Sequence, residues 1–159
     1  MLYAICSRYL RTTEAAKDGL QEILIRIFKN LDKYDASKGS FENWATTIAI
    51  RHCITKLKKK KLTLISDEDQ LATQASYEIE TDILSNYDLI QITKFVADLP
   101  ELYRSVFNLS AIDGYSHNEI GQLLNISVAT SRTRLNRAKS ILKERISKLN
   151  KTESWVDTI

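Results

Sequence analysis

The chain has 159 residues, of which 43% are apolar, 27% are charged, four are glycine and one is proline, and its net charge is +3. This length fits one large domain or two small ones, and the composition excludes collagen-like, mucin-like and fully disordered chains. Because tight hairpins, bulges and barrels draw on Gly and Pro, their scarcity predicts a mainly helical fold.

The charge is unevenly distributed along the chain. Residues 1–61 carry a net +7, residues 62–98 carry −7 and residues 99–159 carry +3. Two basic segments that flank an acidic one are typical of two modules that face nucleic acid, joined by a linker that DNA repels. Solvated charge on unrelated surfaces gives a similar pattern, so this observation alone leaves both interpretations open.

The sequence offers no constellation for metal, cofactor or catalytic chemistry. Cys6 and Cys53 stand outside any metal or redox spacing, and His52 and His117 are far apart. Neither a signal peptide nor a run of the ~20 apolar residues that a membrane span needs is visible. We therefore expect a cytoplasmic protein that is not an enzyme, with reduced, buried thiols and without membrane insertion.

Two helices are predicted before residue 34. Residues 1–11 form a short helix whose inward positions are Leu2, Ile5, Cys6, Tyr9 and Leu10. Residues 14–33 form a second helix with an apolar face made by Leu20, Ile23, Leu24, Ile27, Phe28 and Leu31. Its opposite face holds Asp18, Gln21, Glu22, Ile25 and Lys29. This second face fits a protein-binding surface, although solvated helix surface is the more common explanation.

A turn over residues 34–40 leads into a third helix, which Ser40 caps and which ends at Lys61. Basic and aromatic residues are mixed in this turn and helix: Lys38, Arg51, His52 and Lys56 with Tyr34, Phe41 and Trp44. Such mixtures let unpaired bases stack and neutralise phosphates. Spacing alone favours core positions for Phe41 and Trp44, and lysines at a helix end also suit the helix dipole.

Residues 63–87 are acidic and weakly periodic, which predicts a linker, and a second module begins at residue 88. Pro100 is predicted to be the first residue of a helix that ends at residues 113–114. Residues 150–159 form a tail for which the sequence predicts no role. The helix before Pro100 covers residues 89–99, with inward positions at Leu89, Ile92, Phe95, Val96 and Leu99.

A helix-turn-helix is predicted near the end of the chain. Ser116 and Glu119 form a capping box, which starts a short helix that ends near residue 124. A tight turn at residues 125–126 precedes a long helix that Ser127 caps. One narrow face of this helix is formed by Val128, Ser131, Leu135, Ala138 and Leu142, and the other gathers Thr130, Thr133, Arg134 and Arg137.

The polar face of the last helix has the chemistry of a DNA reader. Arg134 can pair bidentately with guanine, and Thr130 and Thr133 can meet base edges or thymine methyl groups. Arg132 and Arg137 can reach phosphate. An amphipathic surface helix with incidental arginines is the alternative, which the capped short helix before it disfavours.

The motifs of both modules occur together in one family. In the first module they are Asp18, Leu20 to Glu22, Arg26 to Phe28, Gly39 to Phe41, Trp44, Ile48, Ala49 and Leu57. In the second they are Leu99, Pro100, Arg104, Val106, Phe107, Leu109, Gly114 to Ser116, Glu119, Ile120, Leu123, Ile126, Ser127, Thr130, Arg132, Arg134, Leu135 and Arg137 to Lys139. In this order they resemble a bacterial RNA polymerase sigma factor of the extracytoplasmic-function (ECF) group of the sigma-70 family.

This resemblance implies an all-α protein of two small domains, region two at residues 1–62, short at its N-terminus, and region four at residues 88–149. It implies core RNA polymerase and promoter DNA as partners, with the anti-sigma factor that many relatives have. The face that docks on polymerase would be Asp18, Gln21, Glu22 and Ile25. Melted minus-ten DNA would meet Tyr34, Lys38, Ser40, Asn43, Arg51, His52 and Lys56. Duplex minus-thirty-five DNA would meet Ser127, Thr130, Arg132, Thr133, Arg134 and Arg137.

The sequence departs from the family pattern in region two. Gly19 replaces a larger aliphatic residue, which costs its helix up to ~1 kcal/mol relative to Ala. Thr46, Thr47 and Ile50 stand where many members have aromatic or basic residues. Two other functions therefore stay open: a stand-alone helix-turn-helix regulator, and a sigma-like protein that has lost promoter activity.

Overall fold

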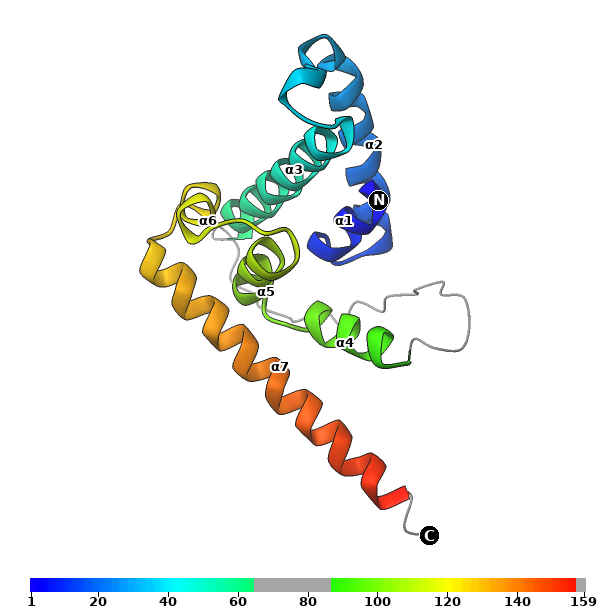
Figure 1. Ribbon diagram of the computed structural model, residues 1–159, viewed down its shortest axis with the longest axis vertical. Coiled ribbons are helices and arrows are strands. Elements are labelled where there is room, and N and C mark those ends of the chain that lie inside the picture. Colours follow the sequence, from blue (N-terminus) through cyan, green and yellow to red (C-terminus); the bar gives the residue numbers. More distant parts are fainter. Residues whose placement is uncertain (65–86, 157–159) are drawn as a thin grey trace. The chain divides into compact units, whose positions relative to one another are not determined.

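The computed structural model of the protein describes residues 1–64 and 87–156, with side chains for residues 1–59 and 92–148. Every regular element in these residues is a helix, which confirms the all-α prediction. The helices gather into two compact units, each with its own core (Figure 1). The predicted acidic linker at residues 63–87 lies almost wholly outside the described residues.

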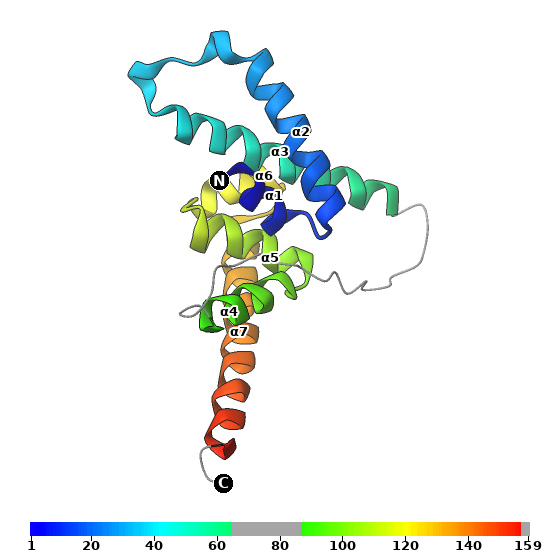
Figure 2. The ribbon, with the colours of Figure 1, turned by 90° about the vertical axis from the view of Figure 1, so that its right-hand side faces the viewer.

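The first unit contains α1 (Leu2–Tyr9), α2 (Thr13–Lys29) and α3 (Phe41–Leu64). α2 and α3 run side by side in opposite directions, joined through the 3-10 turns η1 (Leu31–Lys33) and η2 (Ala36–Lys38) (Figure 2). The three helices bury Ile5, Cys6, Tyr9, Leu10, Ala16, Ile23, Ile27, Ala45, Ala49, Ile50, Cys53 and Ile54. This list confirms the inward positions predicted for the first helix, except that Leu2 is only half-buried.

The apolar face predicted for α2 is only partly buried. Ile23 and Ile27 lie in the core, but Leu24 and Phe28 are 49% and 79% exposed. α2 ends at Lys29 rather than at residue 33, so Leu31 lies in η1, where it is 48% exposed, and the prediction is wrong for these three. The reason is the reach of the neighbouring helix: α1 lies beside the N-terminal part of α2, and the last turns of α2 extend past it (Figure 1). A helical repeat identifies an apolar face but does not say how far another helix covers it.

Gly19 lies where α1 and α2 approach most closely on this side. A Cβ atom at Gly19 would stand 2.6 Å from Leu10 Cδ1 and 3.7 Å from Cys6 Sγ. Because Leu10 is itself buried in a packed core, it has little room to move away. The small residue that departs from the family pattern therefore suits this interface.

Gly19→Leu is expected to lower the free energy of unfolding of the first unit by about 1–2 kcal/mol, because overfilling a packed core outweighs the gain in helix propensity. Urea unfolding followed by circular dichroism measures the effect. In a Leu10→Ala background the same substitution should no longer destabilise, since the clashing side chain has been shortened. Equal losses in both backgrounds would show that the contact with Leu10 is not the cause.

Cys6 and Cys53 are fully buried, free thiols on α1 and α3, as expected. Their mutual hydrogen bond lowers the pKa of Cys6, and the same bond together with burial raises the pKa of Cys53 far above its usual range. Elsewhere in the described ranges, His, Cys, Asp and Glu nowhere cluster as metal ligands would. None of the described helices has both the length and the apolar character of a membrane span.

The second unit contains α4 (Tyr87–Ala97), α5 (Glu101–Phe107), α6 (His117–Leu124) and α7 (Val128–Val156), and α5 continues into the π-helical turn η3 (Asn108–Ile112). α4, α5 and α6 all pack against α7 (Figure 2). Because neither Gly nor Pro interrupts it, α7 continues through residues 150–156, which the sequence assigns to a tail. The core consists of Leu99, Val106, Leu109, Ile120, Leu135, Ala138 and Leu142.

The connection between α4 and α5 differs in detail from the prediction. Pro100 is the N-cap of α5 rather than its first helical residue, and Ile92 is 42% exposed rather than inward. Leu99 is fully buried, as expected. The guanidinium of Arg104, also buried, donates a hydrogen bond to the carbonyl of Ala97 at 2.8 Å and so holds the turn before α5 against this helix.

Candidate functional site

α6 and α7 form the predicted helix-turn-helix. The Ser116 hydroxyl accepts a hydrogen bond from the Glu119 amide at 3.3 Å, and the Glu119 carboxylate accepts one from the Ser116 amide at 2.8 Å, which confirms the capping box. Asn125 ends α6 in the left-handed conformation, with a φ of 55°. A Cβ atom at Gly121 would stand 2.9 Å from the Ile126 carbonyl oxygen, so the tight turn depends on this glycine.

The inner face of α7 fixes it against α6. Ser131, Leu135, Ala138 and Leu142 are buried as predicted, and Val128 is half-buried. The buried hydroxyl of Ser131 makes a hydrogen bond of 2.9 Å with Nδ1 of His117 on α6. The side of α7 that faces away from the core is therefore presented in a defined orientation relative to α6.

The predicted duplex contacts lie on this outer side. The Ser127 hydroxyl caps α7, because it accepts a hydrogen bond from the Thr130 amide at 3.0 Å, and it also lies 2.8 Å from the Thr130 hydroxyl. The Thr133 hydroxyl donates to the Ala129 carbonyl at 3.0 Å, which leaves its methyl group for an apolar contact. Thr130 and Arg134 are half-buried, and the exposed members of the set are Ser127, Arg132, Thr133 and Arg137.

A groove of about 500 Å³ lies beside these residues. Its walls are α7, through Thr130, Thr133, Arg134 and Arg137, and the start of α5, through Leu102 and Tyr103. The sequence does not single out Leu102 and Tyr103 as site residues, because the apolar repeat of α5 indicates only core positions. Leu102 is in fact 45% exposed, which only the packing of α5 on α7 reveals.

Three aromatic side chains form a cluster at the start of α3. Ring centroids are 5.4 Å apart for Tyr34 and Phe41, 5.5 Å for Tyr34 and Trp44, and 5.6 Å for Phe41 and Trp44. Spacing favours core positions for both Phe41 and Trp44. Trp44 is half-buried, but Phe41 is 44% exposed, so the prediction is wrong for Phe41. The rings bury one another instead of entering the core, and they leave aromatic surface for a base to stack on.

Short polar contacts order the loop that carries this cluster. The Tyr34 hydroxyl donates to the Gly39 carbonyl at 3.2 Å, and Gly39 has a φ of 147° that side chains rarely allow. Lys38 lies 3.4 Å from Asp35, and hydrogen bonds from Ser37 hold the pKa of the Asp35 carboxyl below its ordinary value. Ser40 caps α3 as predicted, accepting from the amide of Asn43 at 3.2 Å, and both residues are exposed.

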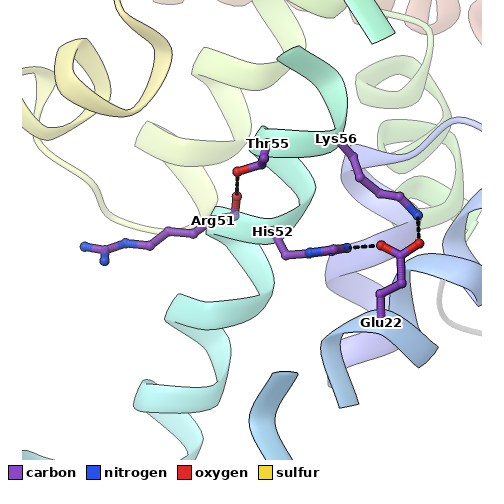
Figure 3. A network of polar contacts seen from close by, with 5 residues as sticks. All are labelled: Glu22, Arg51, His52, Thr55 and Lys56. Carbon is purple, nitrogen blue, oxygen red and sulfur yellow. Dashed lines mark hydrogen bonds and ion pairs between the residues drawn. The ribbon is translucent and has the colours of Figure 1, made fainter. Parts of the chain in front are cut away.

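Further along α3, the predicted minus-ten residues separate onto two sides of the helix (Figure 3). Arg51 is exposed and points away from α2, whereas His52 and Lys56 point toward α2. There the two oxygens of the Glu22 carboxylate lie 2.8 Å from His52 Nε2 and 2.8 Å from Lys56 Nζ. The side chain of His52 is only 7% exposed, so it does not lie on the DNA-facing surface that the sequence predicts for it.

The surroundings of His52 and Glu22 shift the pKa of both groups. Burial lowers the pKa of His52 below its ordinary 6.5, even though Glu22 beside it acts in the opposite direction. The hydrogen bond from Lys56 lowers the pKa of Glu22 below its ordinary 4.5. At neutral pH the imidazole is therefore mainly uncharged and lies in close contact with an ionised carboxylate.

We expect the first unit to lose stability as the pH falls through about 6.5, because the unfolded chain then takes up a proton at His52 that the folded unit does not. His52→Gln should flatten the slope of stability against pH in this window. The slope below pH 4.5 should remain, since a carboxylate with a depressed pKa loses its contribution as it is protonated. Urea unfolding across a pH series measures both, and equal slopes near pH 6.5 in the two proteins would contradict the assignment to His52.

The predicted docking face of α2 is exposed along its length. Asp18, Gln21 and Ile25 are all exposed, and the Ile25 side chain stands 55% open to solvent. Glu22 lies in the same face with its side chain 47% exposed, although α3 holds both of its oxygens. This face combines carboxylates with an unburied aliphatic side chain, a composition suited to a partner that carries cations around an apolar contact.

Comparison with known families identifies the class of protein that combines these two units. The family model "Sigma-70 region 2" matches residues 1–63, and the model "Sigma-70, region 4" matches residues 89–142. The first range covers α1, α2 and all but the last residue of α3, and the second covers α6 with the N-terminal half of α7.

Curated relatives narrow the class further. The chain is 31% identical over 158 residues to the ECF RNA polymerase sigma factor SigW of Bacillus subtilis, covering 93% of this chain and 84% of that protein. It is 20% identical over 137 residues to the ECF RNA polymerase sigma factor SigK of Mycolicibacterium vanbaalenii, covering 84% and 70%. The chain belongs to the ECF group of the sigma-70 family of RNA polymerase sigma factors.

A solved structure has the same fold. The sigma factor RpoE from Bartonella quintana, in complex with the anti-sigma factor NepR, aligns with a TM-score of 0.64 at 18% identity, covering 92% of this chain and 89% of that one. Sigma factors are in general transcription initiation factors rather than enzymes. Membership of this family favours a sigma factor that directs transcription initiation over a stand-alone regulator.

Proposed function

We propose that this sigma factor divides promoter recognition between its two units, with α7 reading duplex minus-thirty-five DNA and the aromatic loop of the first unit holding the melted minus-ten strand. The observation that carries the proposal is the orientation of α7, whose arginine and threonine face is held outward by the capped turn and the buried Ser131 contact. A helix presented in this way fits the major groove, where base edges carry a readable donor and acceptor code.

Within α7, different side chains suit different tasks. Arg134 has a guanidinium fork that matches the two acceptors of guanine, and Thr130 and Thr133 offer methyl groups to thymine. Arg132 and Arg137 are exposed and suit phosphate oxygens. The hydroxyl of Ser127 stays engaged as the cap of α7. Ser127 therefore contributes by forming the helix start, whose first turn is open to a phosphate.

The minus-ten site combines stacking with charge. Phe41 and Trp44 join Tyr34 as stacking surfaces, and the exposed cations Lys38 and Arg51 are available to phosphates. Ser40 and Asn43, exposed at the start of α3, can hydrogen-bond to a base.

The polymerase would dock on the face of α2 formed by Asp18, Gln21, Glu22 and Ile25. The protein would supply no catalytic residue, because polymerisation belongs to its partner, and it would act in the cytoplasm, where that partner works. An anti-sigma factor is a further expected partner, since the chain shares its fold with a sigma factor solved in complex with one.

The test is reconstituted transcription. Purified protein is mixed with core RNA polymerase and a library of promoter fragments, and run-off transcripts that depend on the protein are expected. Polymerase binding without transcripts would instead indicate a sigma-like protein without promoter activity. Duplex binding with a symmetric footprint and no polymerase would indicate a helix-turn-helix regulator.

A further inference from the structure

Glu22 belongs both to the exposed face of α2 and to the contact between α2 and α3. Its side chain is 47% exposed on the α2 face assigned to polymerase, yet both of its oxygens are held by α3. His52 Nε2 lies 2.8 Å from one oxygen and Lys56 Nζ lies 2.8 Å from the other. A hydrogen bond from Lys56 and a close contact with His52, both from α3, therefore define where this carboxylate points (Figure 3).

A carboxylate accepts hydrogen bonds at about four lone-pair positions. Lys56 and His52 occupy only part of this capacity and leave the other positions to solvent, which agrees with the half-exposed state of the side chain. A partner cation can therefore reach Glu22 without displacing either residue. Because the rotamer is already fixed, the partner does not need to order it on binding.

His52 and Lys56 are poorly placed for DNA. His52 is 7% exposed and Lys56 is 30% exposed, and both point toward α2, whereas Arg51 points to the opposite side of α3. A strand held against Arg51 would lie on the other side of the helix from both. The structure therefore separates these two residues from the rest of the minus-ten set.

We propose that His52 and Lys56 are positioning residues for polymerase docking, which hold the Glu22 carboxylate in the orientation that the polymerase recognises. This inference rests on the proposed docking role of α2. It removes both residues from the DNA contacts and makes α3 a support for the polymerase face as well as a holder of the melted strand.

The test is a double-mutant cycle on affinity for core RNA polymerase, measured by titration of fluorescently labelled protein. Lys56→Met keeps the long stem and removes the charge, and we expect it to weaken binding about fivefold. In a Glu22→Ala background the same change should have no further effect, because there is no carboxylate left to position. Lys58→Met, an exposed lysine of the same helix, is the matched control and should leave core affinity unchanged.

His52 offers a conservative rescue. His52→Gln retains an N–H donor near the position of Nε2 and should bind core polymerase as the unaltered protein does, whereas His52→Leu should weaken binding as Lys56→Met does. Unfolding midpoints are measured for every variant. A purely structural role would make affinity follow stability, so His52→Gln and His52→Leu proteins of equal stability with equal affinity would overturn the proposal.

Two further results would also overturn it. Equal weakening by Lys56→Met with and without Glu22 would mean that Lys56 does not act through the carboxylate. Lys56→Met could also leave core affinity unchanged and lower, by about 0.7, the salt slope for binding of the single-stranded minus-ten segment by the holoenzyme. That result would make Lys56 a phosphate contact. If instead Asp18→Lys combined with Ile25→Glu leaves core binding intact, the docking face itself is wrong and both proposals fail.

Discussion

Asp18→Lys combined with Ile25→Glu is expected to reduce the affinity for core RNA polymerase by about 100-fold or more. The first change places a cation where the partner must supply one, and like charges brought together at an interface cost several kcal/mol. The second places a charge at the one aliphatic contact of the face, and the central apolar anchors of an interface contribute about 2 kcal/mol or more each. Ile25 is 55% exposed, so the fold tolerates the change.

These two positions are chosen because neither has a partner on α3 among the contacts described, unlike Glu22. A reversal of Glu22 would also bring like charge against Lys56 and would confuse docking with packing. Co-purification with core polymerase and titration of the labelled protein measure the loss. Glu144→Lys on α7, an exposed acidic residue of the second unit, is the matched control. Retained co-purification of the double variant would refute the docking face.

Arg134→Ala is expected to weaken binding of the holoenzyme to its minus-thirty-five duplex by about 1–3 kcal/mol and to relax specificity at one base pair. Arg134 lines the groove between α5 and α7 and is half-buried, whereas Arg132 and Arg137 are exposed, so its stem is more confined than theirs. A confined guanidinium loses less freedom on pairing with guanine. Competition binding with duplexes substituted at each position of the element measures affinity and specificity together.

Arg132→Ala provides the contrast to Arg134→Ala. Arg132 is exposed two residues before Arg134 on α7. If it is a phosphate contact, Arg132→Ala should weaken binding to all sequences alike and lower the salt slope by about 0.9. If Arg134→Ala also weakened every duplex equally, Arg134 would be a phosphate contact and another side chain would read the base.

Local signals in the sequence predicted the second unit well. The capping box at Ser116 and Glu119, the cap at Ser127 and the inward position of Ser131 each depend on residues within one or two helical turns. Hydrogen bonds of this kind are specified by neighbours in the chain, so their pattern identifies them without the fold. The groove wall at Leu102 was missed because it comes from a different helix.

In the first unit the predictions failed for residues whose burial depends on which other helix packs against them. Phe28 and Leu24 have the spacing of core residues, but both are exposed in the C-terminal half of α2, the part that extends past α1. Phe41 also has core spacing, but it packs on Tyr34 and Trp44 outside the core. His52 has the chemistry of a DNA contact, but a carboxylate 30 residues earlier in the chain draws it inward. Such pairings are decided by helix packing, which periodicity does not encode.

Gly121 of α6, which lies against the turn of the helix-turn-helix, bears on how promoter preference can change. Because a Cβ atom at Gly121 would stand 2.9 Å from the Ile126 carbonyl, any larger residue pushes α6 and α7 apart. The arginines of α7 would keep their chemistry, but each would arrive at a different depth and angle over the bases. If α7 reads the promoter as proposed, promoter preference has two separate sources of variation: side chains on α7 alter which base is accepted, and the turn alters which base pair each side chain meets.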